Sequence, residues 1–454
     1  MPAATHRRHS LGPAVVSALI LLVPAFWNRF PLLEYDTGGY LARWFEGTLV
    51  PSRSTVYGLL LAAGSLDDFW FVVILQAAAA VWIIGVMVKV HGFNTQPAGL
   101  PAVVGVLAVT TALPWLASEL LTDIFAGLGV LALHALVWHG HGLTRRRRAA
   151  LVAFIAFAAA THSATYAVLA VLAIAALILW LFDRTRPRGA AAAQAAAAMV
   201  LGAALLLAGN YVVAKRIAWT PGGYGIAFAR MLQDGIVTRY LDDHCPQARL
   251  KLCPYREQLP LDADAFLWEG GVFDRLGRFT GLGDEMRRIV LESLRDYPAM
   301  QLKAALAATA KQLVAVGTGE GVVKDMWHTD WAIAHFTPWA APAMDAARQQ
   351  HDEFGFAAVN AVHRPLAWVA MALLPLTALL AFYRAAFADL GRLSATVALA
   401  LLANAAVCGI ISNPHDRYGS RIAWTAVFAA ALVGWRWLAL TRMAAARSTA
   451  EVFR

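Results

Sequence analysis

The sequence predicts an all-α polytopic membrane protein, and three observations support this fold class. First, 59% of the 454 residues are hydrophobic and only 15% are charged, whereas a soluble protein of this length carries roughly a quarter charged residues. Second, several uninterrupted apolar runs approach the ~20 residues that a helix needs to cross a bilayer. Third, much of the net charge of +9 lies in short basic clusters beside these runs. Basic residues there orient membrane spans, so the charge does not indicate a nucleic-acid partner.

The apolar runs predict about ten transmembrane helices. They cover Leu11–Trp27, Phe69–Val90, Ala98–Leu113, Leu116–Trp138, Ala149–Ala160, Ala164–Phe182, Ala190–Val213, Leu366–Tyr383, Leu393–Ile411 and Ile422–Leu438. No convincing small-residue cleavage site follows the first run, so we interpret it as a retained signal anchor rather than a cleaved signal peptide.

Basic clusters orient the predicted spans. If all ten spans exist, the clusters fall on one side, which the positive-inside rule makes cytoplasmic. They are Arg7-Arg8, Arg145–Arg148, Arg184–Arg188, Arg384 with Arg392, and Arg442 with Arg447. The Ala/Arg-rich composition is typical of a bacterium. We therefore expect a multi-pass protein of the bacterial inner membrane whose active site faces the periplasm.

This topology divides the chain into three regions. Residues 1–213 form an N-terminal membrane module with the first periplasmic loop, residues 214–365 a helical or irregular periplasmic domain, and residues 366–454 the C-terminal membrane helices. Cys245 and Cys253 lie in the periplasmic domain, where disulfides are permitted, so we expect a bridge between them. Two free thiols are the alternative, and zinc is disfavoured because further ligands at suitable spacing are missing.

Polar groups of the first periplasmic loop are the leading candidates for chemistry. Glu34 and Asp36 follow the first span directly. Asp36 precedes a short amphipathic helix, which we expect to lie in the membrane interface. The alternative is that Asp36 only caps this helix. Arg53, in the same loop, is either a phosphate contact or an ordinary arginine at the level of the lipid headgroups.

The fourth and fifth spans add three more candidates. Glu119 and Asp123 are four residues apart, which predicts two carboxylates on one helix face, where they either bind a cation or raise one pKa. The alternative is a solvated helix start, where the helix dipole favours acidic residues. His162 lies in the break Thr161-His162-Ser163, and a lone histidine there has either a functional or a structural role.

The turn before the last span is unusually rich in functional groups. It contains His415, Asp416, Arg417, Tyr418 and Arg421 within a few residues. The planar guanidinium group of arginine suits phosphate recognition. On the cytoplasmic side, His134, His139 and His141 resemble a metal site, but they lie beside an arginine cluster and away from the other candidates. No phosphate-binding glycine loop, zinc-protease motif or nucleophile elbow occurs, so we expect no nucleotide cofactor.

The layout resembles the GT-C superfamily of polytopic glycosyltransferases. Those enzymes carry an acidic residue just after the first span, and Asp36 in Glu34-Tyr35-Asp36-Thr37-Gly38-Gly39-Tyr40 matches that position. An acidic pair opens their fourth-span region, as Glu119 and Asp123 do here. The break at His162 and the turn Asp416-Arg417-Tyr418 resemble two further features, although lysine is common where this chain has His162.

The resemblance implies transfer of a sugar from a polyprenyl-phosphate donor to an envelope glycan, lipid or protein acceptor. Asp36 would act as general base on the acceptor hydroxyl, and Arg417, Arg421 and Arg53 would hold the donor phosphate. Glu119 and Asp123 would bind either the sugar or a divalent cation such as Mg²⁺ or Mn²⁺.

Two rival functions use the same residues differently. A transporter or flippase of lipid-linked sugars would only bind its cargo, but the internal repeats frequent in transporters are not evident. A non-catalytic envelope assembly protein would tolerate replacement of the acidic residues. In either case the expected partners are membrane lipids and lipid-linked glycans, not nucleic acid.

Overall fold

The computed structural model describes residues 11–93, 98–182 and 189–452. This part of the chain is helical, and its isolated β-bridge joins Leu32 to Glu119 in parallel. The basic residues Arg7, Arg8 and 184–188, which supported the predicted orientation, lie outside the described residues.

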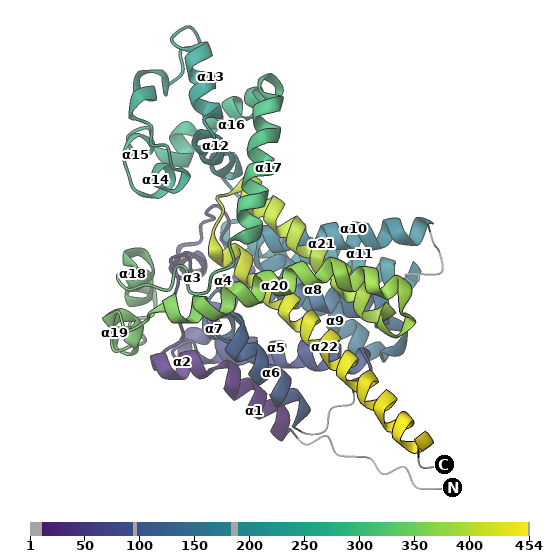
Figure 1. Cartoon of the computed structure of the whole chain (residues 1–454). Helices are drawn as coiled ribbons and strands as arrows, with labels where there is room; N and C mark the ends of the chain where they lie inside the picture. The colour runs from purple at the N-terminus through teal and green to yellow at the C-terminus, as the bar shows by residue number, and fades with distance from the viewer. Residues whose placement is uncertain (1–10, 94–97, 183–188, 453–454) are drawn as a thin grey trace.

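Seven helices in the described part are long and apolar enough to cross a membrane (Figure 1). They are α5 (Trp70–Val90), α10 (Ser163–Phe182), α11 (Gly189–Ala214), α20 (Phe356–Tyr383), α21 (Ala388–Ile411), α22 (Asp416–Val452) and α8 (Ile124–His139). Helix α8 reaches the required length together with the 3₁₀ turn Gly140–Gly142 that continues it. Helix α8 lies at the centre of the bundle, because every residue from Ile124 to Val137 is buried. The predicted class of helical membrane protein therefore has direct support in the helix lengths.

The predicted count of ten spans is not confirmed. The first predicted span is divided into α1 (Gly12–Leu21) and α2 (Val23–Asn28), with a proline in the first turn of α2. Proline cannot donate the backbone hydrogen bond that would continue the preceding helix. The third and fifth predicted spans form α6 (Gly99–Thr110) and α9 (Arg145–Thr161), both shorter than the ~20 residues that a bilayer requires.

A long polar stretch connects α11 to α20, and we call residues 215–355 the connecting segment. Its helices are α12 (Gly223–Gln233), α13 (Ile236–His244), α14 (Ala263–Trp268), α15 (Val272–Arg275), α16 (Arg278–Asp296), α17 (Pro298–Val314), α18 (Trp327–Phe336) and α19 (Ala341–Asp345). Short 3₁₀ turns occur at Cys253–Gln258 and Arg348–His351. Helices α12 to α16 form a lobe at one end of the molecule (Figure 1).

The connecting segment contributes to two different hydrophobic cores. Buried side chains from Phe228 to Val290 pack into a core of their own. In contrast, Met326, Ile333 and Met344 join the main core of the membrane helices. The region predicted as one periplasmic domain thus consists of a separate lobe and a stretch that packs against the helical bundle.

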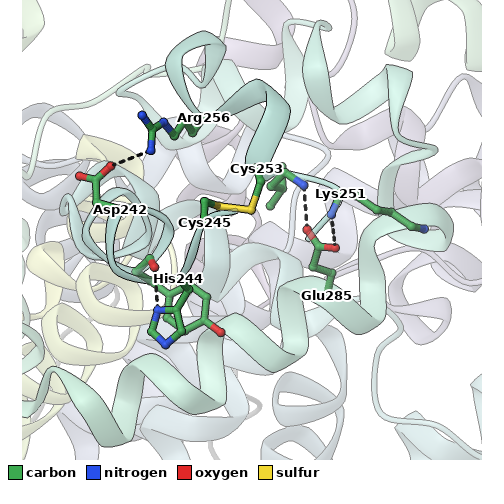
Figure 2. Close-up of a disulfide and its surroundings, with 9 residues drawn as sticks. Asp242, His244, Cys245, Lys251, Cys253, Arg256 and Glu285 are labelled. Carbon is green, nitrogen blue, oxygen red and sulfur yellow. Dashed lines mark hydrogen bonds and ion pairs between the residues drawn. A yellow bond between two sulfur atoms is a disulfide. The ribbon is translucent and has the colours of Figure 1, made fainter. Parts of the chain in front are cut away.

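The lobe contains the predicted disulfide between Cys245 and Cys253 (Figure 2). The bond closes the turn after α13. Glu285 on α16 accepts hydrogen bonds from the backbone amides of Lys251 and Leu252, at 2.8 and 3.0 Å. The disulfide and this carboxylate together fix the turn against α16.

The short amphipathic helix of the first loop is α3 (Thr37–Glu46), and most of it is covered by other parts of the protein. Every residue from Thr37 to Arg43 is buried, because α3 packs between α4 (Thr55–Gly64) and α18. A Cβ added at Gly38 would lie 2.6 Å from the backbone of Thr329, so a glycine is required for this approach of α18.

Candidate functional site

Asp36 connects two arginines that are distant in the sequence. Its Oδ1 accepts a hydrogen bond from Arg53, and its Oδ2 accepts one from Arg417 Nη2 at 2.7 Å. Arg417 Nη1 also donates to Glu34 Oε1. We call Glu34, Asp36, Arg53 and Arg417 the arginine–carboxylate network. It joins three candidates of the first loop to one candidate of the turn before the last span.

The turn before α3 positions both carboxylates. The backbone amide of Asp36 donates to Glu34 Oε2 at 2.7 Å, and the hydroxyl of Thr37 donates to the carbonyl of Leu120 at 3.0 Å. Asp36 occupies the N-cap position of α3, but its carboxylate accepts from the two arginines and makes no capping hydrogen bond. The alternative that Asp36 only caps the helix is therefore wrong.

A glycine-rich stretch that was not among the predicted site residues, Gly317-Thr318-Gly319-Glu320-Gly321, covers Glu34. Gly321 has a φ of +85°, and a Cβ there would lie 2.4 Å from Glu34 Oε1. Glu320 accepts from the backbone amide of Arg417 at 2.8 Å. Three glycines around one acidic residue are the sequence signal that could have identified this stretch, because they allow a close backbone approach.

The two carboxyl groups have opposite electrostatic properties. Burial raises the pKa of Glu34 to about 7, with Arg417 opposing and Asp36 adding to the rise. Burial also acts to raise the pKa of Asp36, but Arg53 and Arg417 outweigh it, so this pKa is well below its usual range. Asp36 is therefore ionised at neutral pH, whereas Glu34 is poised to exchange a proton. Such divergent pairs are typical of acid–base sites.

Arg53 also lines a small pocket, whose volume of about 10 Å³ holds about one water molecule. Hydroxyl and amide side chains contribute much of the lining, together with apolar residues from α11 and the loops. The lining residues are Leu49, Val50, Ser52, Arg53, Ser54, Ser163, Leu206, Asn210, Trp219, Thr220 and Pro221. Arg53 thus joins a pocket of hydrogen-bonding groups to the Asp36 carboxylate.

Glu119 and Asp123 do not share a helix face as predicted. Glu119 has extended backbone angles after α7 (Leu113–Ser118), and Asp123 is the residue before α8. The carbonyl of Glu119 accepts from Gln76 at 2.8 Å. The fourth predicted span is interrupted here because residues 119–123 bond to Leu32 and Gln76 instead of continuing a helix.

Arg421 is fully buried and serves a different part of the structure from Arg417. Its guanidinium donates to Asn404 Oδ1 at 3.0 and 2.6 Å and lies 3.4 Å from Asp123 Oδ1. Because Asp123 already faces a cation, a Mg²⁺ or Mn²⁺ ion between Glu119 and Asp123 would compete with Arg421. The side chain of Tyr418 lies beneath both guanidinium groups, at 5.0 Å from Arg417 and 5.5 Å from Arg421.

The remaining polar residues of the turn attach neighbouring segments. His415 contacts Asp264 of the lobe at 3.2 Å and Glu320 at 2.9 Å. Asp416 pairs with Arg364 on α20 and accepts from the backbone amide of Gly317 at 2.8 Å. The turn is therefore both a part of the network, through Arg417, and an anchor for the connecting segment. Sequence reasoning missed Asp264 and Arg364.

His162 lies beside the pocket but outside the direct contacts of the network. It ends α9, and its Nδ1 accepts from the amide of Ala164 at 3.2 Å. Burial lowers its pKa, and the positive charges of Arg421, Arg417 and Arg53 lower it further. His162 is therefore neutral, and it is the sequence neighbour of Ser163, which lines the pocket.

No known protein family, curated protein or solved structure matches the chain.

Proposed function

We propose that the protein is a membrane glycosyltransferase that moves a sugar from a polyprenyl-phosphate donor to an envelope acceptor at the periplasmic face of the bacterial inner membrane. The observation that supports this most directly is the double contact of Arg53. It pairs with Asp36 and also lines a pocket of hydroxyl and amide groups. The groups of this pocket match a sugar phosphate in kind, because arginine binds phosphate oxygens in a fixed planar geometry. The pocket itself has room for about one water molecule, so binding of the donor requires it to widen.

The charge of the network favours an anionic ligand. Two guanidinium groups face one ionised Asp36 and a Glu34 whose pKa is raised to about 7. At neutral pH Glu34 is protonated in a substantial fraction of molecules, and in those molecules the network carries a net positive charge. A donor phosphate supplies the missing negative charge.

The same arrangement couples donor binding to the activation of Asp36. Paired with two arginines, Asp36 is a weak base, because its pKa is well below the usual range. When a phosphate draws Arg53 and Arg417 away, the pKa of Asp36 rises and its oxygens become free to accept the proton of an acceptor hydroxyl. The arginines would then stabilise the lipid phosphate as it leaves.

The test compares envelope glycans and glycolipids by mass spectrometry in cells with and without the gene. Asp36→Asn should fail to restore the missing glycoconjugate although the protein is produced at the wild-type level. The control is Asp68→Asn in the same loop, at a residue with φ +52° in a region that asparagine tolerates. Full activity of Asp36→Asn would remove Asp36 as the base.

A second assay separates transfer from transport. Purified protein in detergent is incubated with a polyprenyl-phosphate-sugar lipid extract and an envelope glycan fraction. Detergent removes the two compartments, so a transporter leaves the donor unchanged, whereas a transferase consumes it. Binding without consumption would favour a carrier of lipid-linked sugars.

A further inference from the structure

Three histidines gather at the ends of two central helices. His91 directly follows α5, and His134 and His139 lie in the last two turns of α8. One ring nitrogen of each lies within 4.8 Å of those of the other two. We call these residues the histidine cluster. Asp123 and His139 are at opposite ends of the 16-residue helix α8, about 24 Å apart at 1.5 Å per residue, so the cluster is separate from the arginine–carboxylate network.

Hydrogen bonds at Nδ1 fix the tautomer of two of these histidines, His91 and His134. His91 Nδ1 lies 2.8 Å from the carbonyl of Met87, which can only accept, so Nδ1 carries the proton. The hydroxyl of Thr396 donates to the carbonyl of Arg392 at 2.8 Å and therefore accepts from His134 Nδ1 at 2.9 Å. In both residues Nε2 then presents a lone pair, as it does in metal-bound histidines whose second nitrogen is held in this way.

The Nε2 atoms of all three histidines are buried and have no hydrogen-bond partner among the described residues. His91 and His134 are only 2% and 1% exposed. Buried polar atoms almost always have a partner, and lone pairs cannot bond to one another. A packing role alone would explain one such histidine, but three together lack the group that binds them.

We propose that the histidine cluster binds one divalent transition-metal ion of the zinc class through the three imidazole rings. Imidazole nitrogen is a preferred ligand of Zn²⁺, at about 2.1 Å. Nitrogens of a tetrahedral zinc site are then roughly 3.4 Å apart, so the separation of up to 4.8 Å requires a small inward rotation of the rings. Three neutral ligands leave a fourth position for water.

Charged groups around the cluster are partly balanced. Arg436 donates to the carbonyl of His91 at 2.5 Å but is paired with Asp389 at 3.1 Å. The guanidinium of Arg392 lies over the ring of Trp138, at 5.4 Å. The ion would connect α5 to α8 and, through Thr396, to α21, so its expected role is to hold this end of the bundle together.

The test measures metal bound to the full-length protein, purified in detergent with an affinity tag that contains no histidines. After removal of loosely bound metal and titration with zinc, elemental analysis should find about one zinc ion per chain. Competition with a chromogenic chelator should show affinity lowered at least ~100-fold by His134→Ala and about 10-fold by Thr396→Val, which removes only the partner of Nδ1.

His141→Ala is the matched control, because His141 is exposed and lies outside the cluster. It should leave zinc binding and the thermal midpoint unchanged. If His134→Ala fails to fold, the wild-type protein loaded with Co²⁺ should still show the visible absorption of a four-coordinate site, and Thr396→Val should weaken it. Absence of stoichiometric zinc, or an equal loss in His141→Ala, would overturn the proposal and leave a packed histidine cluster only.

Discussion

Arg417 has a central position among the individual residues, because one guanidinium group bonds to two carboxylates. Glu34 is only 2% exposed, and the other hydrogen bond to its carboxylate comes from the backbone amide of Asp36. Buried ion pairs are costly to break, since the remaining charge loses its partner and cannot be solvated. The network therefore depends on this arginine for its stability as well as for any ligand that it binds.

Replacement of Arg417 by methionine should destabilise the protein by about 3 kcal/mol, because it leaves Glu34 and Asp36 with fewer partners in a buried site. Arg417→Lys should recover part of this loss, since one ammonium group can bond to only one of the two carboxylates well. Thermal unfolding in detergent measures the stability of both variants. Arg442→Met, at an exposed residue of the same helix, should leave the thermal stability almost unchanged. A loss of stability equal to that of Arg417→Met would show that α22 tolerates no substitution.

The pairing of Arg417 with Asp36 could not be predicted from the sequence. The two residues are 381 positions apart, and no periodicity relates them. What the sequence did predict was that both belong to polar groups on one face, through the order of the apolar runs. Gly321, which covers Glu34, was missed because it lies in an irregular stretch without a helical pattern.

At the scale of elements, the apolar runs predicted α5, α10 and α11 well, because these helices are continuous and uniformly apolar. The pattern failed where a run is apolar but does not continue as one helix. Leu11–Trp27 is interrupted before Pro24, and Leu116–Trp138 is interrupted at residues 119–123. Pro24 marks the first interruption in the sequence itself. The second could not be detected, because the bonds that replace the helix there come from Leu32 and Gln76, far away in the sequence.

The lobe of the connecting segment should attach less firmly as the pH rises. Burial acts to lower the pKa of His415, but Asp264 and Glu320 outweigh it and raise this pKa to about 9. Between its ordinary value of 6.5 and about 9, the folded protein keeps a proton that the unfolded chain loses. The stabilisation is thus complete below pH 6.5 and is lost as the pH approaches and passes about 9.

The thermal midpoint and limited proteolysis of the lobe, measured from pH 6 to pH 9.5, would reveal this loss. His415→Gln should flatten the decline in that window, because glutamine carries no titrating proton. His351→Gln, at an exposed histidine of the same connecting segment, should preserve the wild-type profile. A decline of unchanged steepness in His415→Gln would assign the pH dependence to other groups.

For the whole molecule, the lobe and the arginines that begin α9 should lie on opposite sides of the membrane. The arginine cluster is at the start of α9. Helices α9, α10 and α11 follow one another along the chain, and the polar lobe comes after α11. We expect the arginines on the cytoplasmic side by the positive-inside rule, and the lobe should then be periplasmic.

Cysteine labelling in intact cells tests this arrangement against a clean background. Of the three native cysteines, two are bonded to each other and Cys408 is buried. A membrane-impermeant maleimide should label Arg295→Cys on α16, which is exposed, without permeabilisation. It should label Arg146→Cys, also exposed, only after the inner membrane is opened. The reverse pattern would invert the topology and move the arginine–carboxylate network to the cytoplasmic side.

Helix α22 carries three arginines that bond to separate parts of the bundle. Arg417 reaches the network, Arg421 faces Asp123 before α8, and Arg436 pairs with Asp389 on α21. Arg417 and Arg436 are about 28 Å apart along the helix axis. A piston-like slide of α22 by one turn of about 5.4 Å would break all three attachments at once. The helix is therefore locked in a single register, and motions that open the site must bend or displace other segments around it.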